Sequence, residues 1–147
     1  MSRRSVREQA FRLIYQLEFV HDDPKDIFNN CSSRLRYIDE YEKRIIYDEL
    51  FGVYENLSEI DEIITHNSKW AMNRLNKVDL ALIRLGIYEL LYEKNKIPIV
   101  INEIVNLASR YGTSSSANFV NGILHVISCD IENTESSDLY SNDDFDF

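Results

Sequence analysis

The stretch VDLALIRLGIYELLYE, residues 78–93, decides how the rest of the chain is interpreted. Apolar side chains recur along one side at helical spacing and also cover the other sides: Val78, Ala81, Leu82, Leu85, Tyr88 and Tyr92, then Leu80, Ile83, Ile87, Leu90 and Leu91. A helix that is apolar nearly all round is buried, so the pattern predicts a central helix with other helices around it. Because an unpaired charge in a core is costly, we expect its charges at the helix ends or on a narrow exposed strip. These charges belong to Asp79, Arg84, Glu89 and Glu93.

Two further helices follow the central one. The segment VINEIVNLASRYG, residues 100–112, has an apolar stripe and a glycine, Gly112, where a helix would end. The segment TSSSANFVNGILHVI, residues 113–127, has serines at 114–116 that could cap the next helix. Gly122 falls inside this last pattern, and a mid-helix glycine costs about 1 kcal/mol against alanine, so we expect close packing there.

The motifs of this half of the chain resemble the NusB family. They are RLGIYEL at residues 84–90, INE at 101–103 with Leu107 and Ala108, Tyr111 with Gly112, and FVNG at 119–122. The N-terminal RRSVREQAFRLIYQLE, residues 3–18, resembles the arginine-rich first helix of that family, and Trp70 falls where many members have a tryptophan. The resemblance implies an all-α fold, a compact single-domain bundle of about seven helices.

Composition is consistent with one helical domain. The chain has 147 residues, 44% of them hydrophobic, with four glycines and two prolines, which leaves few turns for an all-β protein. The two cysteines form no motif and no signal peptide precedes the charged N-terminus, so we expect a cytoplasmic protein. The longest uncharged stretch, residues 111–129, is too polar to span a bilayer.

The net charge of −9 is concentrated at the C-terminus. Seven acids and no Lys or Arg occur from Asp130 onward, and the rest of the chain carries 18 acids against 16 bases. We expect a folded domain over residues 1–130 and an acidic tail over 131–147 without regular structure. The tail either only aids solubility or competes with RNA for the arginines of the N-terminus.

The first predicted helix, residues 3–20, has a core stripe of Val6, Ala10, Leu13, Ile14 and Leu17. Along one flank of that stripe lie Arg3, Arg4, Arg7, Phe11 and Tyr15. Guanidinium groups pair with phosphates and aromatic rings stack on bases, a combination typical of RNA recognition. The alternative is structural: the arginines pair with acids such as Glu8, and the rings widen the core.

The middle of the chain reads as helices without a linker. Pro24 suits the start of a short helix running to about Tyr37. A seam follows, formed by Ile46, Leu50, Val53, Leu57, Ile60 and Ile64. A capping box over residues 58–61 predicts that two helices divide this seam near Asn56. Trp70 is expected as a core anchor in preference to a base-stacking platform.

No catalytic constellation is present in the sequence. His125 and Cys129 are spaced as two ligands on one helix face, but no second pair completes a zinc site. Neither a nucleophile elbow nor a phosphate loop occurs. We therefore expect a protein that is not an enzyme and uses no cofactor.

The resemblance implies a transcription antitermination factor. Such a factor binds the boxA element of nascent ribosomal RNA together with NusE and supports elongating RNA polymerase through other Nus factors. Carried over residue by residue, Arg3, Arg4 and Arg7 would contact phosphates, and Tyr15, Asn118 and Phe119 would lie at the RNA surface. Asn118 replaces a lysine of many members, and Ser5 an arginine of some. Asp79 matches an acidic position near RNA and NusE, and Arg84 and Glu89 are further candidates for the partner surface.

Two alternatives come from other classes. A protein-binding scaffold with little RNA affinity would explain the near-neutral body and the two missing cations. NusB-like domains also occur fused to ribosomal RNA methyltransferases, but a chain ending at Phe147 leaves no room for a catalytic domain. The sequence leaves a monomer and a homodimer equally open.

Overall fold

The computed structural model describes residues 2–20, 23–31, 35 and 38–143, and the helices of this part form one bundle. The seven α-helices found there are α1 (Arg3–Leu17), α2 (Pro24–Asn30), α3 (Glu40–Glu55), α4 (Leu57–Asn67), α5 (Lys77–Leu91), α6 (Ile97–Tyr111) and α7 (Ser116–Asp143), with a 3-10 turn, η1 (Met72–Arg74), before α5. No strand occurs in these described ranges. The predicted all-α fold is confirmed.

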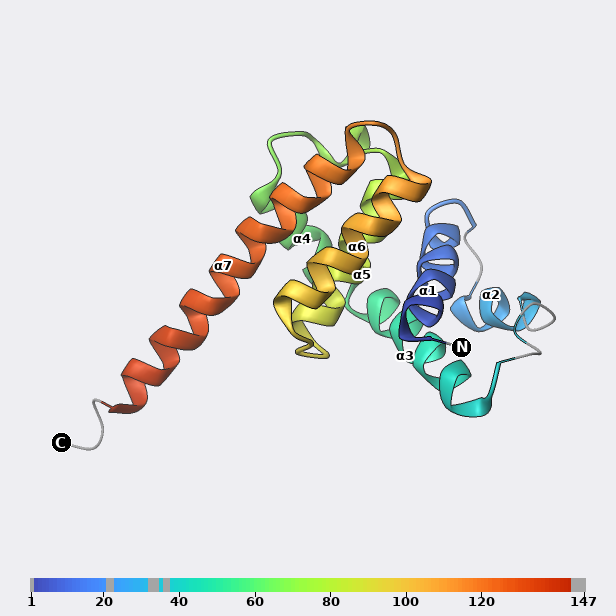
Figure 1. Ribbon diagram of the computed structural model, residues 1–147, viewed down its shortest axis with the longest axis horizontal. Coiled ribbons are helices and arrows are strands. Elements are labelled where there is room, and N and C mark those ends of the chain that lie inside the picture. Colours follow the sequence, from blue (N-terminus) through green and yellow to red (C-terminus); the bar gives the residue numbers. More distant parts are fainter. Residues whose placement is uncertain (1, 21–22, 32–34, 36–37, 144–147) are drawn as a thin grey trace.

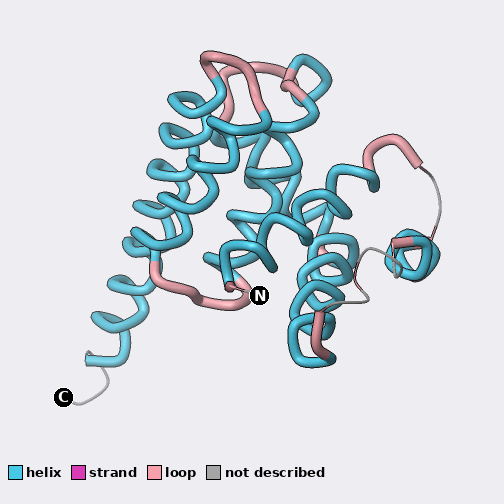
Figure 2. The backbone as a smooth tube through the Cα atoms, turned by 45° about the vertical axis from the view of Figure 1, so that its right-hand side comes forward, coloured by secondary structure: helices cyan, strands magenta, loops and turns pink. Residues whose placement is uncertain are grey.

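Helix α5 is the centre of the bundle, as its all-round apolar sequence predicts. It packs against α1, α3, α4, α6 and α7, and Leu80, Leu82, Ile83, Leu85 and Ile87 have no exposed surface. Asn76 caps its start, because its Oδ1 accepts a hydrogen bond from the Val78 backbone N–H at 2.8 Å. Figure 1 shows α1, α2 and α3 gathered to one side of α5, α6 in front of α5, and α7 on the other side. Figure 2 shows the same bundle from a second direction, with helices joined by loops in the described part.

The helix ends follow local signals in most places. The predicted division near Asn56 is confirmed, although Asn56 itself is the cap and the residues of the proposed capping box lie inside α4. Gly112 ends α6 as expected, and a Cβ there would strike the side chain of Ser116. Helix α1 ends at Leu17, and α2 ends at Asn30, earlier than the predicted Tyr37. Residues 36–37 lie outside the described part.

Three packing expectations were wrong. Trp70 is 57% exposed and so is not a core anchor. A Cβ at Gly122 would meet no atom within 4 Å, whereas one at Gly86 would lie 3.1 Å from Leu124 Cδ2 and one at Gly52 would strike the Tyr88 ring. The charge of Arg84 lies neither at an end of α5 nor on an exposed strip, because Arg84 is buried in mid-helix; Asp79 and Glu89 lie in the first and last turns, as expected, although both are buried.

Helix α7 continues into the acidic segment. It runs as one helix to Asp143, and Figure 1 shows it extending past the other helices. Composition alone predicted no regular structure after residue 130. The division into a domain over 1–130 and a tail over 131–147 stays a prediction.

Candidate nucleic-acid interface

The three N-terminal arginines occupy three different environments. Ser2 caps α1 by accepting a hydrogen bond from the Ser5 N–H, which places Arg3 and Arg4 in the first turn. The side chain of Arg4 is 62% exposed. It donates two hydrogen bonds to Glu103 of α6, at 2.8 and 3.0 Å. Since exposed pairs of this kind are weak, Arg4 is available to a phosphate.

Arg7, by contrast, is part of the interior. It is 4% exposed, and its Nε and Nη2 each donate to Glu89 at 2.7 Å. Arg3 is intermediate: it donates to Glu49 at 2.5 Å and to Glu89 at 3.2 Å, with 36% of its side chain exposed. Arg7 is therefore paired with an acid, as the structural alternative predicted, although the acid is Glu89 and not Glu8.

All three residues expected to bind a protein partner are buried, and two of them, Arg84 and Glu89, are paired inside the bundle. Arg84 donates to both carboxylate oxygens of Asp61, at 2.9 and 2.8 Å, and to Glu18 at 2.7 Å. Glu89 accepts from Arg3, Arg7 and Asn95. These pairs connect α5 to α1 and α4, so Arg84 and Glu89 do not form a docking surface. The expectation was wrong because the charges are paired inside the bundle instead of solvated outside it.

Asp79 is the exception, because it lines a cavity. The cavity has a volume of about 520 Å³ and is formed by Trp70, Arg74, Leu75, Asn76, Asp79, Ser115 and Phe119, from η1, α5 and the start of α7. Within the described residues, Oδ1 of Asp79 is buried and has no hydrogen-bond partner. Burial raises the pKa of Asp79, against the opposing effect of a hydrogen bond with Ser116. A buried acceptor without a partner requires an explanation, and a ligand that donates a hydrogen bond is one.

The walls of this cavity suit a nucleotide. Trp70 and Arg74 are exposed and Phe119 is half-buried. Aromatic rings stack on bases with about 1–3 kcal/mol per base, and a guanidinium pairs with phosphate. A base amino group can donate to a carboxylate such as Asp79. The exposure of Trp70, which contradicts a place in the core, is needed if its ring is to stack on a base.

Tyr15 and Asn118 remain at the surface. Tyr15 is half-buried, with its ring edge-on to the exposed Phe19 at 4.9 Å between centroids. Asn118 is exposed on the first turns of α7, beside Phe119 in the sequence. Both positions agree with the predicted RNA surface, whose role for these residues stays a prediction.

A further group of residues was missed by the sequence reasoning. The guanidinium groups of Arg12 and Arg110 lie 5.6 and 5.4 Å from the Tyr111 ring centroid. Glu8 accepts hydrogen bonds from Tyr111 and Arg110. The side chains of Arg12 and Arg110 are 46% and 54% exposed. A signal existed, because Arg4, Glu8 and Arg12 are spaced by four and share one flank of α1.

These residues follow one line along α1. Helix α1 is antiparallel to α5, since Arg7 near its start binds Glu89 and Glu18 at its end binds Arg84. From Arg4 to Tyr15 the helix rises about 16 Å at 1.5 Å per residue. The cavity at the start of α5 lies toward the Tyr15 end. The surface of α1 therefore has exposed cations near its N-terminus and aromatic rings near its C-terminus.

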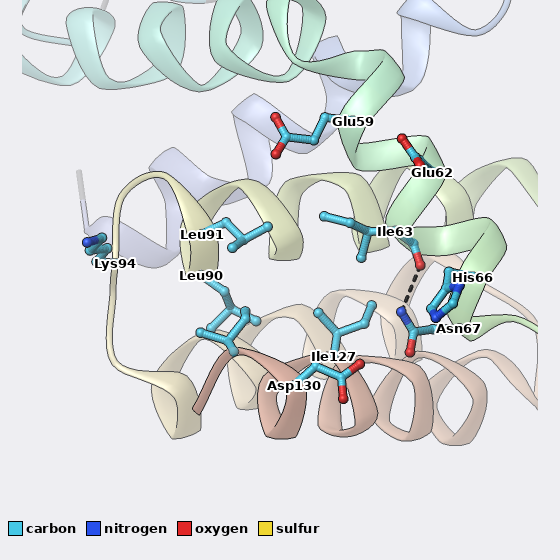
Figure 3. A pocket seen from close by; sticks show the side chains of 11 residues that line it. Glu59, Glu62, Ile63, His66, Asn67, Leu90, Leu91, Lys94, Ile127 and Asp130 are labelled. Atoms are coloured by element: carbon cyan, nitrogen blue, oxygen red, sulfur yellow. Dashed lines mark hydrogen bonds between the residues drawn. The ribbon is translucent and has the colours of Figure 1, made fainter. Parts of the chain in front are cut away.

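A second, larger groove has the opposite charge. It has a volume of about 620 Å³ between α4, the end of α5 and α7, and Figure 3 shows Leu90, Leu91, Ile63 and Ile127 facing one another across it. Its charged lining consists of Glu59, Glu62, Asp130 and Lys94. Neither α4 nor α7 contains a Lys or Arg. A phosphate backbone would be repelled from these walls.

No helix of the described ranges is long and apolar enough to cross a membrane. In the same part of the chain, no group of three or more His, Cys, Asp or Glu side chains is arranged to hold a metal ion.

Comparison with known proteins assigns the family. The model of the NusB family matches residues 4–128. This chain belongs to the NusB family. The transcription antitermination protein NusB of Acetivibrio thermocellus is 42% identical over 127 residues, covering 84% of this chain and 86% of the relative. The recognised motifs of α5, α6 and α7 are thus NusB motifs.

Solved NusB structures share the fold. T. maritima NusB is 39% identical with a TM-score of 0.78, covering 86% of this chain and 90% of that one. A chain from the complex of antitermination factors NusB and NusE with double-stranded RNA is 27% identical with a TM-score of 0.78, covering 85% of this chain and 94% of that chain. The NusB fold therefore extends over most of the sequence.

Proposed function

We propose that this NusB-family chain is a transcription antitermination factor of the cytoplasm that binds boxA-type RNA together with NusE. With other Nus factors it supports elongating RNA polymerase. NusB relatives are named for transcription antitermination, and a similar chain has been solved with NusE and RNA. The observation that carries the RNA proposal is the cavity that Asp79 lines together with Trp70 and Phe119. One carboxylate oxygen of Asp79 is buried and has no hydrogen-bond partner among the described residues.

The RNA path in this proposal follows α1. Arg4 and, on release from its partners, Arg3 bind phosphates at the start of the helix, and Tyr15 and Asn118 border the path. Trp70 and Phe119 stack on a base at the cavity, where Asp79 accepts a hydrogen bond from it. Arg7 touches no RNA in this arrangement; it fixes α1 on α5 and so positions the residues around it.

The protein partner uses the second groove. A partner segment with apolar anchors and positive charges fits walls whose charged residues are three acids, Glu59, Glu62 and Asp130, against one base, Lys94. This assignment replaces Arg84 and Glu89, which are buried in ion pairs. A scaffold without RNA binding is the second candidate function, and the groove is the feature that favours it.

The test is a titration with single-stranded and double-stranded boxA-like RNA, with and without NusE, at two salt concentrations. For single-stranded RNA each phosphate contact contributes about 0.7 to the slope of log affinity against log salt. Arg4→Ala should lower that slope by about this amount. Arg44→Ala is the matched control, because Arg44 is also exposed and paired on its own helix, 3.1 Å from Asp48, but lies on α3.

The aromatic cavity and the groove are tested in the same titration. Trp70→Ala should weaken RNA binding by roughly tenfold or more, at about 1–3 kcal/mol per stacked base, and Tyr41→Ala, an exposed ring on α3, should not. Ile63→Asp in the groove should weaken NusE and leave RNA alone unaffected. Binding of NusE without any RNA affinity at either salt would establish the scaffold function instead.

A further inference from the structure

Three carboxyl groups and two guanidinium groups meet between α1, α3 and α5. Glu49 of α3 and Glu89 of α5 are fully buried. Arg3 and Arg7 of α1 bind them, and Glu93 lies 3.8 Å from Arg3. Negative groups outnumber positive ones in this cluster. One carboxyl must therefore be neutral or poorly compensated.

Glu49 is the poorly compensated member. Its Oε1 accepts from Arg3 Nη1 at 2.5 Å, and within the described residues its Oε2 is buried without a partner. Burial, and next the charge of Glu89, raise the pKa of Glu49 to about 8. Arg7 cannot replace Arg3 at Glu49 without leaving Glu89, which it binds through two N–H groups.

Arg3 joins this cluster to the surface. It lies in the first turn of α1 beside the exposed Arg4, and 36% of its side chain reaches solvent. The same guanidinium thus has two possible partners, the buried carboxyls and a ligand outside. An ionised Glu49 and an RNA phosphate compete for it.

We propose that Glu49 is a proton-linked latch that controls whether Arg3 binds RNA. An ionised Glu49 holds Arg3 against the interior, and protonation of Glu49 leaves Arg3 only its longer contacts, 3.2 Å to Glu89 and 3.8 Å to Glu93, so that a phosphate competes for it more easily. Binding of RNA through Arg3 then takes up one proton, because the carboxylate left behind would be buried beside Glu89. This inference rests on the proposed RNA binding and adds a control to it.

The direction follows from the charges around Glu49. The groups that face it are Arg3 and Arg7 from α1, and Tyr88, Glu89 and Glu93 from α5; Asp48 of α3 acts on Tyr88 and Glu93. Burial raises the pKa of Tyr88 to about 12, so its charge does not change near neutral pH. Removal of Arg3 leaves mainly negative neighbours, which raises the pKa of Glu49 further in the complex. RNA affinity must therefore fall as pH rises through the pKa that Glu49 has in the protein without RNA.

The experiment measures RNA affinity at pH 6.5 and pH 8.5 at constant salt. If RNA binding takes up one proton and the pKa of Glu49 without RNA is about 8, the RNA affinity of the wild type should fall by about fourfold between these two pH values. Glu49→Gln keeps an oxygen that accepts from Arg3 and cannot ionise. It should bind RNA at pH 8.5 as tightly as the wild type does at pH 6.5. Arg3→Gln, a change at a half-exposed side chain, should bind more weakly and lose the pH dependence.

Two results would overturn the latch. One is the same pH dependence in wild type and Glu49→Gln; the other is a wild-type affinity that does not change with pH. Should Glu49→Gln fail to fold, Arg3→Gln against wild type gives the same comparison. A carbon-13 titration of the Glu49 carboxyl, with and without RNA, tests proton uptake directly. Absence of RNA binding at either pH would refute both the proposed function and the latch, whereas pH-independent binding refutes the latch alone.

Discussion

Arg7→Ala is the substitution that best separates a structural arginine from an RNA-binding one. The change removes both hydrogen bonds of 2.7 Å to Glu89 and leaves one oxygen of a fully buried carboxylate without its donor. Breaking a buried pair by removing one partner costs about 3–5 kcal/mol. Domains of this size have free energies of unfolding of about 5–15 kcal/mol. The loss is therefore a large share of the total stability.

The assay is urea denaturation at pH 7, followed by circular dichroism. With a slope of about 2 kcal/mol per M, the midpoint of Arg7→Ala should fall by roughly 2 M. Arg4→Ala is the control on the same helix, because the Arg4 guanidinium is exposed and its loss should change the stability little. A third variant, Arg7→Lys, keeps the charge but not the two-point geometry, so an intermediate midpoint is expected.

One outcome would refute this reasoning. If Arg7→Ala unfolds within about 1 kcal/mol of wild type and instead loses RNA affinity as Arg4→Ala does, Arg7 is a phosphate contact. The buried pair with Glu89 would then not be the main contribution of Arg7 to the protein. A large stability loss with little effect of Arg4→Ala supports the positioning role.

The remaining predictions concern packing and pH. Gly122→Ala should stabilise the protein by about 1 kcal/mol, because the site is open and alanine favours a helix. Gly52→Ala should instead destabilise it by about 1–3 kcal/mol, since its Cβ would strike the Tyr88 ring; thermal unfolding measures both, and equal effects would contradict the packing difference. Burial alone would raise the pKa of Glu18, but its hydrogen bonds, first that from Arg84, hold it below 4.5. Stability from Glu18 is thus present above pH 4.5 and lost as pH falls through its folded-state value. The urea midpoint should fall less between pH 7 and pH 3.5 in Glu18→Gln than in the wild type. An equal fall in both proteins would argue against a stabilising role of the Glu18 carboxylate.

Much of the fold could be predicted because helical periodicity records burial. The apolar surface of α5 marked it as central, and the seam from Ile46 to Ile64 marked two helices with a break near Asn56. The recognised motifs added the family, which no periodicity contains. Gly122 shows the limit of the same reasoning, because a glycine in a helix does not reveal whether anything packs on it.

The candidate site was predictable as a region and not as a set of contacts. The arginine-rich start of α1 and the residues around Phe119 were singled out as an RNA-binding region, and that role stays a prediction. Of the arginines there, Arg4 is exposed and Arg7 is buried. The exposure of Trp70 was not predicted, because the cavity that Trp70 lines also includes Ser115 and Phe119, which lie more than forty positions away. Arg12 carried a local signal, its spacing from Arg4, that was overlooked.

The sequence by itself determined that this protein is helical, which helix is central and to which family it belongs. Only the tertiary structure decided which charges are free. Arg7 and Glu89 are 82 positions apart, and Arg3 and Glu49 are 46 apart. The spacing of residues along a helix fixes the face on which a charge lies. The partner of that charge depends on how separate helices dock, so the arginines of one ridge ended in three different environments.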